Sequence, residues 1–280
     1  MGLIVVTGST GRLGGRVARR LAAAGVPQRL LVRDQARAPH LPGATVATAE
    51  YSDHTACRIA MTGADTVLMV SAAEDAGRLA QHRTFVDAAA EAGIGHLVYI
   101  SFYGAGPTST FTLARDHWAT EEHIKTTGLP HTFLRDNLYA DFVPMMVGAD
   151  GVIRGPAGTG RASVVAQDDI ADVTAAVLRD PAPHTGLTHD LTGPEALTLA
   201  DMCEIITEVT GDPVRYQQET IEEAYASRSS YNAPGWLVDA WVSTYTAIAN
   251  GEMTGVSSAV PDITGHPATP LAEVLRRSAA

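Results

Sequence analysis

The chain has 280 residues, of which 45% are hydrophobic and 18% charged, and its formal net charge at pH 7 is −11. This composition predicts an ordinary globular protein with one large α/β domain, or one domain and a smaller appendage. The acidic balance argues against nucleic acid or an anionic membrane as a partner. No apolar run approaches the length of a membrane span, and we expect a cytoplasmic protein.

The chain begins with a pattern of strand, glycine-rich turn and helix. Residues 3–7 are mostly apolar and lead directly into the turn, after which apolar residues recur every fourth position from residue 13 to residue 21. Gly8 permits a sharp turn, Gly11 lets a diphosphate approach the backbone, and Gly14 lets the helix pack close to the strand. The N-terminus of that helix offers N–H groups to phosphates. We therefore expect a dinucleotide site whose residues here are Gly8, Thr10, Gly11, Arg12, Leu13 and Gly14.

Strand and helix patterns then alternate as far as residue 135. The spacing predicts strands at 28–32, 45–49, 66–71, 96–101 and 131–135, with helices at 56–61, 78–92 and 116–126. Strands that alternate with helices predict a parallel, doubly wound sheet of the Rossmann type. We assign residues 1–140 to this dinucleotide-binding domain.

The regular alternation of strand and helix patterns ends near residue 140. The glycine-rich run 151–160 is expected to form a surface loop or a short hairpin, and a helix is expected to open at 168 with acidic residues near its start. A late strand at 187–191 is expected to return to the sheet, and helices are expected near 199–210 and 234–250. Residues 141–280 are therefore predicted to form mainly a smaller, substrate-binding lobe.

The end of the second strand bears on the choice of cofactor. In NAD-binding folds an acidic residue there binds the ribose hydroxyls, whereas an arginine nearby accommodates the 2′-phosphate of NADP. Here the strand is followed by Arg33, which favours NADP(H), while the adjacent Asp34 keeps NAD(H) possible. Asp53 follows the third strand, where it is expected to contact the adenine amino group; it is also a candidate cap of the next helix, and the two roles are compatible. Ser71 and Ala72 end the fourth strand and are expected near the diphosphate and the nicotinamide ribose.

Several motifs together resemble the NmrA-like branch of the atypical short-chain dehydrogenases. They are the glycine turn at 7–14 and the segments 32–34, 51–53, 81–83, 99–101, 134–137 and 264–271. Within the branch the chain is similar to bacterial NAD(P)H:quinone oxidoreductases and to triphenylmethane reductase. The resemblance implies NADPH binding, a C-terminal substrate lobe and hydride transfer to a quinone or a related polycyclic aromatic. Ser101 ends the fifth strand and Asn137 follows the sixth, and both are expected contacts of the cofactor.

The catalytic acid of ordinary short-chain dehydrogenases is missing. They use Tyr-x-x-x-Lys on a helix, but Lys125 is the only lysine of this chain. His117 and Glu121 share a helix face, where a carboxylate would raise the pKa of the imidazole and favour a proton donor; a surface pair or a crevice wall is the alternative. Tyr103 and Tyr139 are further candidates, and solvent is enough to protonate a hydroquinone anion.

Other residue groups carry weaker predictions. Five aromatic residues are candidates for a substrate pocket, although core packing is the commoner use of such residues: Trp118, Tyr231, Trp236, Trp241 and Tyr245. No histidine pair shows metal-ligand spacing with a third ligand, so no metal site is expected. The expected partner is a small aromatic or quinone molecule, and the chain is a monomer or a homodimer.

Two other functions fit the same scaffold. One is a tailoring enzyme, either a reductase or a cofactor-assisted oxygenase, that acts on an aromatic polyketide quinone. The other is a redox sensor that binds NADP(H) and a protein partner without turnover, which the missing tyrosine–lysine pair motivates. Incorporation of oxygen from O₂ separates oxygenation from reduction, and acceptor-dependent loss of NADPH separates an enzyme from a sensor.

Overall fold

The computed structural model describes residues 2–279, which form two compact units. The first unit comprises the residues up to Ser101 together with Asp116–Arg135 and Asp168–His189. The second comprises Phe102–Arg115, Asp136–Gln167 and the chain from Asp190 onward. The chain thus passes repeatedly from one unit to the other.

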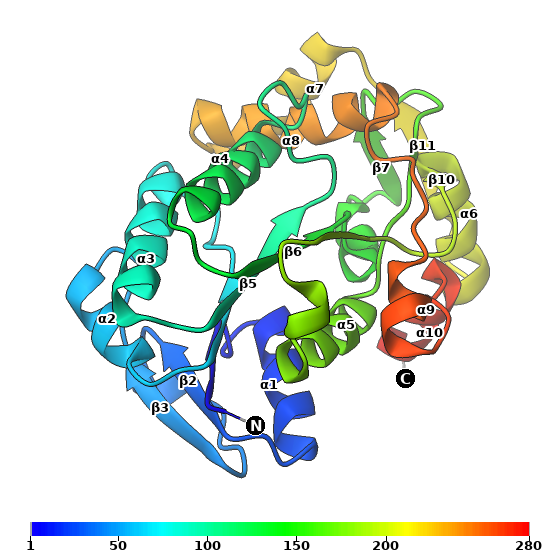
Figure 1. The fold of residues 1–280 in the computed structure, drawn as a ribbon. Helices are drawn as coiled ribbons and strands as arrows, with labels where there is room; N and C mark the ends of the chain where they lie inside the picture. The colour runs from blue at the N-terminus through cyan, green and yellow to red at the C-terminus, as the bar shows by residue number, and fades with distance from the viewer. Residues whose placement is uncertain (1, 280) are drawn as a thin grey trace. The chain divides into compact units, whose positions relative to one another are not determined.

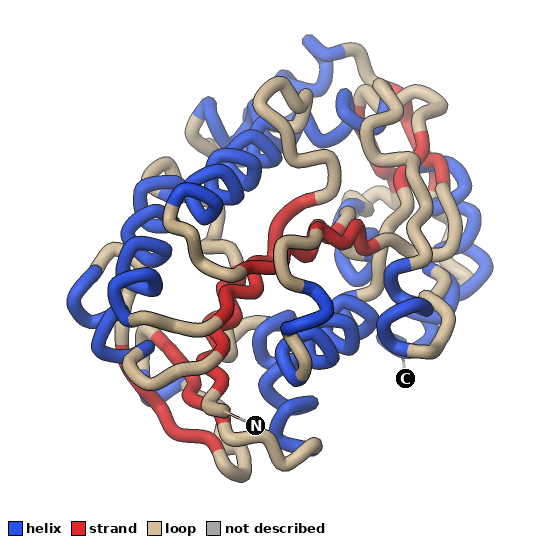
Figure 2. Tube along the Cα trace, in the orientation of Figure 1, coloured by secondary structure: helices blue, strands red, loops and turns tan. Residues whose placement is uncertain are grey.

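A seven-stranded sheet organises the first unit, with the strand order β3–β2–β1–β4–β5–β6–β9 (Figures 1 and 2). Its strands are β1 Ile4–Thr7, β2 Gln28–Val32, β3 Ala44–Thr48, β4 Thr66–Val70, β5 His96–Phe102, β6 His131–Asp136 and β9 Thr188–Leu191. The pairs β1–β2, β2–β3, β1–β4 and β4–β5 are parallel. The strand order reverses between β1 and β4, and ligands of such sheets bind outside the carboxyl ends of the strands at this switch point.

Helices cover both faces of this sheet (Figure 1). They are α1 Arg12–Ala23 and α5 Gln167–Arg179 on one face, and α2 His54–Met61, α3 Arg78–Ala92 and α4 Thr112–Thr126 on the other. Alternate strand residues such as Val5, Val67 and Tyr99 join one core cluster with Phe85 of α3 and Ile124 of α4. This alternation is what the two-residue period of a strand requires when both faces are buried.

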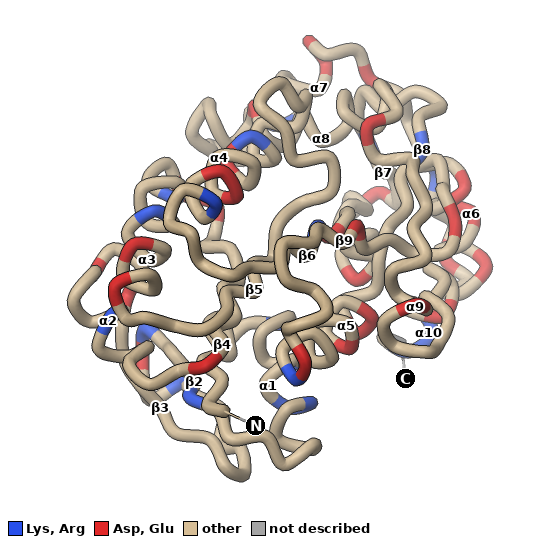
Figure 3. Tube along the Cα trace, in the orientation of Figure 1, with Lys and Arg blue, Asp and Glu red and all other residues tan. Residues whose placement is uncertain are grey.

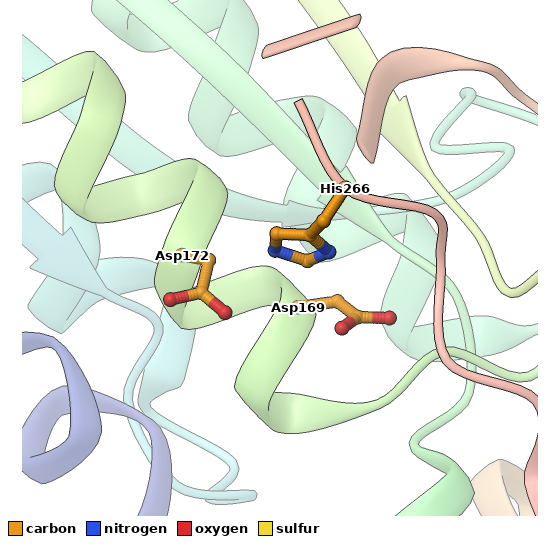
Figure 4. Close-up of side chains that lie close together, drawn as sticks. All are labelled: Asp169, Asp172 and His266. Carbon is orange, nitrogen blue, oxygen red and sulfur yellow. The ribbon is translucent and has the colours of Figure 1, made fainter. Parts of the chain in front are cut away.

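Ion pairs join α1 to α5 across their exposed edges. Arg16 Nε lies 3.1 Å from Asp168 Oδ1, and Arg20 Nε lies 2.6 Å from Asp172 Oδ1. Figure 3 shows the basic residues of α1 and the acidic residues of α5, and Figure 4 shows Asp169 and Asp172 on α5. The sequence predicts acidic residues at the start of α5, where they interact favourably with the helix dipole. In the structure, Asp168 and Asp172 also form ion pairs with α1.

The second unit contains two small sheets and most of the C-terminal helices. Strand β7 Val152–Gly155 pairs in parallel with β11 Arg215–Gln218, and β8 Arg161–Ala162 pairs antiparallel with β10 Leu197–Thr198. The helices are α6 Leu199–Thr210, α7 Ile221–Arg228, α8 Gly235–Ala249, α9 Ala259–Thr264 and α10 Leu271–Ala279. In the two units together, residues 2–279 also form the 3₁₀ helices Gln35–Arg37, Ala140–Met146, Ala182–His184 and Ser229–Tyr231.

The Rossmann-type α/β fold is confirmed, and one local prediction is wrong. Residues 151–160 do not form a surface loop or a hairpin, because β7 pairs with β11 and Ile153 is fully buried. Two glycines of this run allow close packing. A Cβ on Gly155 would lie 2.3 Å from the ring of Tyr245, and one on Gly160 would lie 2.1 Å from the carbonyl oxygen of Ile248. At these two positions other parts of the unit pack directly on the backbone, which leaves no room for a side chain.

Element bounds otherwise follow the sequence pattern closely. Helix α6 has the predicted bounds 199–210, whereas α4 begins at Thr112, before the predicted start at 116. Strand β9 is the predicted late strand that joins the sheet. Helices α7, α9 and α10 were not expected from the pattern. None of the helices formed by residues 2–279 combines the length and apolarity of a bilayer span.

Candidate dinucleotide site and aromatic cavity

The turn between β1 and α1 has the backbone form that a diphosphate requires. Gly8 adopts a φ of +66°, which L side chains rarely tolerate. A Cβ on Gly14 would lie 2.4 Å from the carbonyl oxygen of Gly8, so only glycine lets α1 start this close to the strand. Gly11 is the N-cap of α1 and provides no capping side chain. Backbone N–H groups at this helix start are thus available to an anion, and the turn fits a dinucleotide.

A cavity of about 500 Å³ opens over this turn in the first unit. Nine of the predicted cofactor residues line it, namely Gly8, Thr10, Gly11, Arg12, Leu13, Gly14, Arg33, Ser71 and Ala72. The remaining walls come from the ends of β2, β3 and β4, where Glu50, Tyr51 and Ser52 follow β3 and Ala73, Glu74 and Asp75 follow β4. The cavity therefore lies at the carboxyl ends of neighbouring strands, as ligand sites of such sheets do.

Arg33 and Asp34 have different surroundings, which bears on the cofactor. Arg33 is exposed and lines the cavity together with Arg12. The carboxylate of Asp34 turns back instead and accepts a hydrogen bond of 2.9 Å from the amide of Ala36, capping a 3₁₀ helix. The acid that keeps NAD(H) possible in the sequence is thus used for capping, and the arginine faces the cavity.

Asp53 caps helix α2. Its Oδ1 accepts a hydrogen bond of 2.9 Å from the amide of Ala56, which satisfies one of the free donors at the helix start. Asp53 is therefore the cap of this helix, which is one of the two roles predicted from the sequence. Asp53 does not line the cavity, and its contact with the adenine stays a prediction.

Tyr51 is a cavity residue that the sequence reasoning used only as part of a motif. Its hydroxyl lies 2.6 Å from Thr7 Oγ1 and 2.7 Å from the carbonyl oxygen of Val70, so it ties the ends of β1 and β4 together. Burial raises the pKa of this phenol, and its proton therefore stays in the network. The sequence signal for Tyr51 is a tyrosine in the segment that follows the third strand of a Rossmann sheet.

His117 lies in a buried network and differs from the prediction. Its Nε2 is 2.7 Å from Arg78 Nη2 and its Nδ1 is 2.9 Å from Tyr99 Oη. Because a guanidinium only donates, Nε2 accepts, and Nδ1 carries the proton that is given to the phenol. Burial, followed by the charge of Arg78, lowers the pKa of His117 well below its ordinary value. The expected rise of this pKa is thus wrong.

Glu121 forms hydrogen bonds with Ser101 and Arg135. Its carboxylate accepts hydrogen bonds from Ser101 Oγ at 2.6 Å, from Arg135 Nε at 2.8 Å and from Arg135 Nη2 at 2.5 Å. Glu121 and Ser101 are both fully buried. The predicted cofactor residue Ser101 therefore lies beneath the carboxyl end of β5, where it holds a carboxylate, and its contact with the cofactor stays a prediction.

The remaining predicted site residues lie in the second unit. Tyr139 Oη donates to Asp136 Oδ2 at 2.7 Å. Asn137 is buried, donates from Nδ2 to the carbonyl oxygen of Met253 at 3.0 Å and accepts from the amide of Leu138. Burial, followed by the charge of Asp190, raises the pKa of Tyr103. The catalytic roles of Tyr103, Tyr139 and His117 stay predictions.

A second cavity, of about 620 Å³, lies within the second unit. Its aromatic lining is Tyr139, Phe142, Tyr231, Trp241 and Tyr245, to which Met145, Met146 and Met202 add flexible apolar surface. Three of the five aromatic residues predicted for a substrate pocket are in this set, whereas Trp118 and Trp236 do not line it.

A buried ion pair fixes one wall of this aromatic cavity. Arg228 Nη1 lies 3.1 Å from Glu219 Oε2, and the guanidinium carbon lies 5.0 Å from the ring centroid of Tyr245. The ring of Tyr231 meets that of Trp241 edge to face, with centroids 5.8 Å apart. Volume and lining suit a flat aromatic molecule.

Comparisons with known proteins agree with these features. An NAD(P)H azoreductase of Xenophilus azovorans is 30% identical over 283 residues, covering 99% of this chain and 98% of its own. The crystal structure of an NADPH-dependent quinone oxidoreductase of Escherichia coli complexed with NADPH is 31% identical with a TM-score of 0.90, covering 99% of this chain and all of the other.

A third relative carries the same fold. The Citrobacter triphenylmethane reductase complexed with NADP(H) is 30% identical with a TM-score of 0.87, over 98% of this chain and 99% of its own. The model of the NmrA-like family matches residues 1–233. With the glycine turn, the strand order and the cavity at the switch point, these matches show that the chain belongs to the NmrA-like family.

Proposed function

We propose that this protein is an NADPH-dependent oxidoreductase that transfers hydride to a quinone or a related polycyclic aromatic acceptor. The observation that carries the proposal is the cavity over the β1–α1 turn, where Arg12 and Arg33 line the wall and the carboxylate of Asp34 is turned away. Relatives at 30–31% identity are named oxidoreductases of quinones, azo compounds and triphenylmethane dyes. An NAD(P)H-dependent oxidoreductase activity with NADP(H) follows from that family membership, and the quinone is our proposal.

The residues of the first unit have distinct roles toward the cofactor. NADPH supplies the hydride. The N–H groups at the start of α1 hold its diphosphate, and the backbone of Gly11 lets the phosphates come close. Arg33, with Arg12, binds the 2′-phosphate through charge-assisted hydrogen bonds. Tyr51 keeps β1 and β4 in register beneath the cavity.

We propose that the proton that completes quinone reduction comes from a source other than His117. Both ring nitrogens of His117 are engaged, one by Arg78 and one by Tyr99, and its depressed pKa leaves it without an acidic proton near neutral pH. A hydroquinone anion is stabilised by resonance, so either solvent or a nearby phenol is able to protonate it. We propose Tyr139, which lines the aromatic cavity, and Tyr103 as the phenols to test.

The acceptor is proposed to bind in the aromatic cavity of the second unit. A volume of about 620 Å³ is sufficient for two or three fused rings. Met145 and Tyr231 are 67% and 69% exposed, which is unusual for large apolar side chains and is relieved when a flat aromatic covers them. The proposed partner is thus a small molecule. We also propose that the protein acts in the cytoplasm and that it is a monomer or a homodimer.

Anaerobic NADPH consumption by the purified protein tests this function. Benzo-, naphtho- and anthraquinones are compared with a reaction without acceptor, and NADPH binding is followed separately by fluorescence. Consumption that depends on one ring class supports the proposal and measures the size of the cavity. Binding of NADPH without consumption under any acceptor refutes it and favours the redox sensor, whereas consumption only in air, with oxygen incorporated into the product, favours the oxygenase.

A further inference from the structure

The loop after β4 forms one wall of the cofactor cavity. Residues 70–75 line the cavity in an unbroken run, and the chain then enters α3 at Arg78. The loop is braced from α3 at two points. The amide of Ala72 donates to His82 Nε2 at 2.9 Å, and Asp75 Oδ1 accepts from the amide of Gly77 and from Gln81 Nε2. Of these two contacts, the one at Ala72 involves a fully buried side chain, that of His82, whereas Asp75 is exposed.

The tautomer of His82 follows from the groups around it. The ring Nδ1 lies 2.9 Å from Thr120 Oγ1, and that hydroxyl donates its own proton to the carbonyl oxygen of Asp116 at 2.8 Å. Thr120 therefore accepts from Nδ1, which must carry the ring proton. Nε2 is left with a lone pair, which is what the amide of Ala72 needs as an acceptor.

The surroundings keep His82 in this form. The side chain is fully buried and its ring meets those of Tyr51 and Tyr99 edge to face at 6.3 and 5.9 Å. Burial, followed by the charge of Arg78, lowers the pKa of His82 to about 3. The imidazole is thus neutral near pH 7, with Nε2 as the acceptor.

We propose that His82 is a positioning residue for the cofactor, which accepts from the Ala72 amide and so holds the loop at 71–75 in the shape that NADPH requires. The inference rests on the proposed function for the identity of the cofactor. Thr120 sets the tautomer of His82 and acts one step further away. Without the brace the amide of Ala72 loses its acceptor and the loop must order itself when the cofactor binds, which weakens binding.

Three variants test the brace. His82→Phe keeps an aromatic ring and removes both nitrogens, His82→Gln restores an acceptor near the place of Nε2, and Thr120→Val removes the group that fixes the tautomer. The dissociation constant of NADPH is measured by fluorescence without any acceptor substrate, and amide exchange is measured at Ala72. We expect His82→Phe to raise the dissociation constant about tenfold and to lose protection at Ala72. His82→Gln should recover most of both, and Thr120→Val should fall between them.

His96 provides a matched control. It is also buried, its Nε2 lies 2.9 Å from Thr132 Oγ1, and its pKa is lowered to about 4. It stands at the opposite end of β5 from the cavity and does not line it. His96→Phe should lower stability and leave the dissociation constant of NADPH within twofold of wild type.

The outcomes separate the inference from the proposed function. Equal dissociation constants for wild type and His82→Phe refute the role of His82, and so does an equal increase in His96→Phe. A wild-type protein that does not bind NADPH refutes the proposed function and the inference together. Binding without turnover refutes only the proposed reaction, because the variants are compared by cofactor binding and by exchange at Ala72.

Discussion

Glu121 offers the sharpest stability prediction in the first unit. Its carboxylate is fully buried, receives two hydrogen bonds from Arg135 and one from Ser101, and joins α4 to the ends of β5 and β6. Replacing Glu121 with glutamine keeps the shape but removes the charge that balances Arg135, whose side chain is only 21% exposed. Breaking a buried pair by removing one partner typically costs about 3–5 kcal/mol. Partial exposure of Arg135 places the expected loss near the lower limit, at about 3 kcal/mol.

The neighbouring Glu122 provides the control for this variant. Its side chain is 44% exposed and pairs with Lys125 at 2.6 Å on the same helix. Such pairs contribute about 0.5 kcal/mol or less, so Glu122→Gln should be nearly silent. Urea unfolding of both variants measures the difference, and a loss of about 3 kcal/mol corresponds to roughly 6–12 °C in melting temperature. If Glu121→Gln unfolds within about 0.5 kcal/mol of Glu122→Gln, the buried carboxylate does not stabilise the unit and the reasoning fails.

Three further predictions concern the cofactor and pH. Arg33→Ala should raise the dissociation constant of NADPH about tenfold and that of NADH less than twofold, with Arg37→Ala as the control; equal losses for both cofactors would contradict the assignment of the 2′-phosphate. Gly14→Ala places a Cβ 2.4 Å from the carbonyl oxygen of Gly8 and should abolish NADPH binding while lowering stability by about 1–3 kcal/mol in urea unfolding; unchanged binding would show that the turn tolerates a side chain. Because the pKa of His96 falls to about 4 on folding, the unfolded chain binds the extra proton below its ordinary pKa of about 6.5. The contribution of His96 should therefore be complete above pH 6.5 and smaller by about 1–2 kcal/mol at pH 5, and the lowered pKa values of His82 and His117 act in the same direction. His96→Gln should reduce the pH dependence by about 1–2 kcal/mol without removing it; a dependence of the urea midpoint between pH 7 and pH 5 equal to that of wild type would contradict this.

The parts of the fold that the sequence predicts well are those in which local pattern and burial agree. The glycine turn from Gly8 to Gly14 follows from backbone geometry alone, since positive φ and close approach allow no other residue. Helix α6 combines an apolar period with a capping box at Thr198 and Asp201 and a stop at Gly211, and its predicted bounds agree with the structure.

The predictions that fail depend on partners far away in the chain. Gly155 looks like a turn residue until Tyr245 packs on it, and no local signal reveals that contact. His117 and Glu121 share a helix face, yet Arg78 and Arg135 from other elements take part in their hydrogen bonds. Burial, followed by the charge of Arg78, sets the sign of the histidine pKa shift. Spacing on a helix shows which side chains are neighbours, whereas charge and burial are supplied by the tertiary fold.

The segments of the two units alternate along the sequence, and this order has a consequence for biosynthesis. Helix α5 belongs to the first unit but lies at 167–179, and β9 completes the sheet only at Leu191. A nascent chain that has emerged as far as residue 140 therefore lacks the partner of Arg16 and Arg20 and the last strand of the sheet. The face of α1 that packs on α5 and the edge of the sheet at β6 stay uncovered until about fifty more residues leave the ribosome. During this time the incomplete sheet is able to bind chaperones or to aggregate. A fragment that ends near residue 190 is accordingly the shortest N-terminal piece expected to hold a complete sheet.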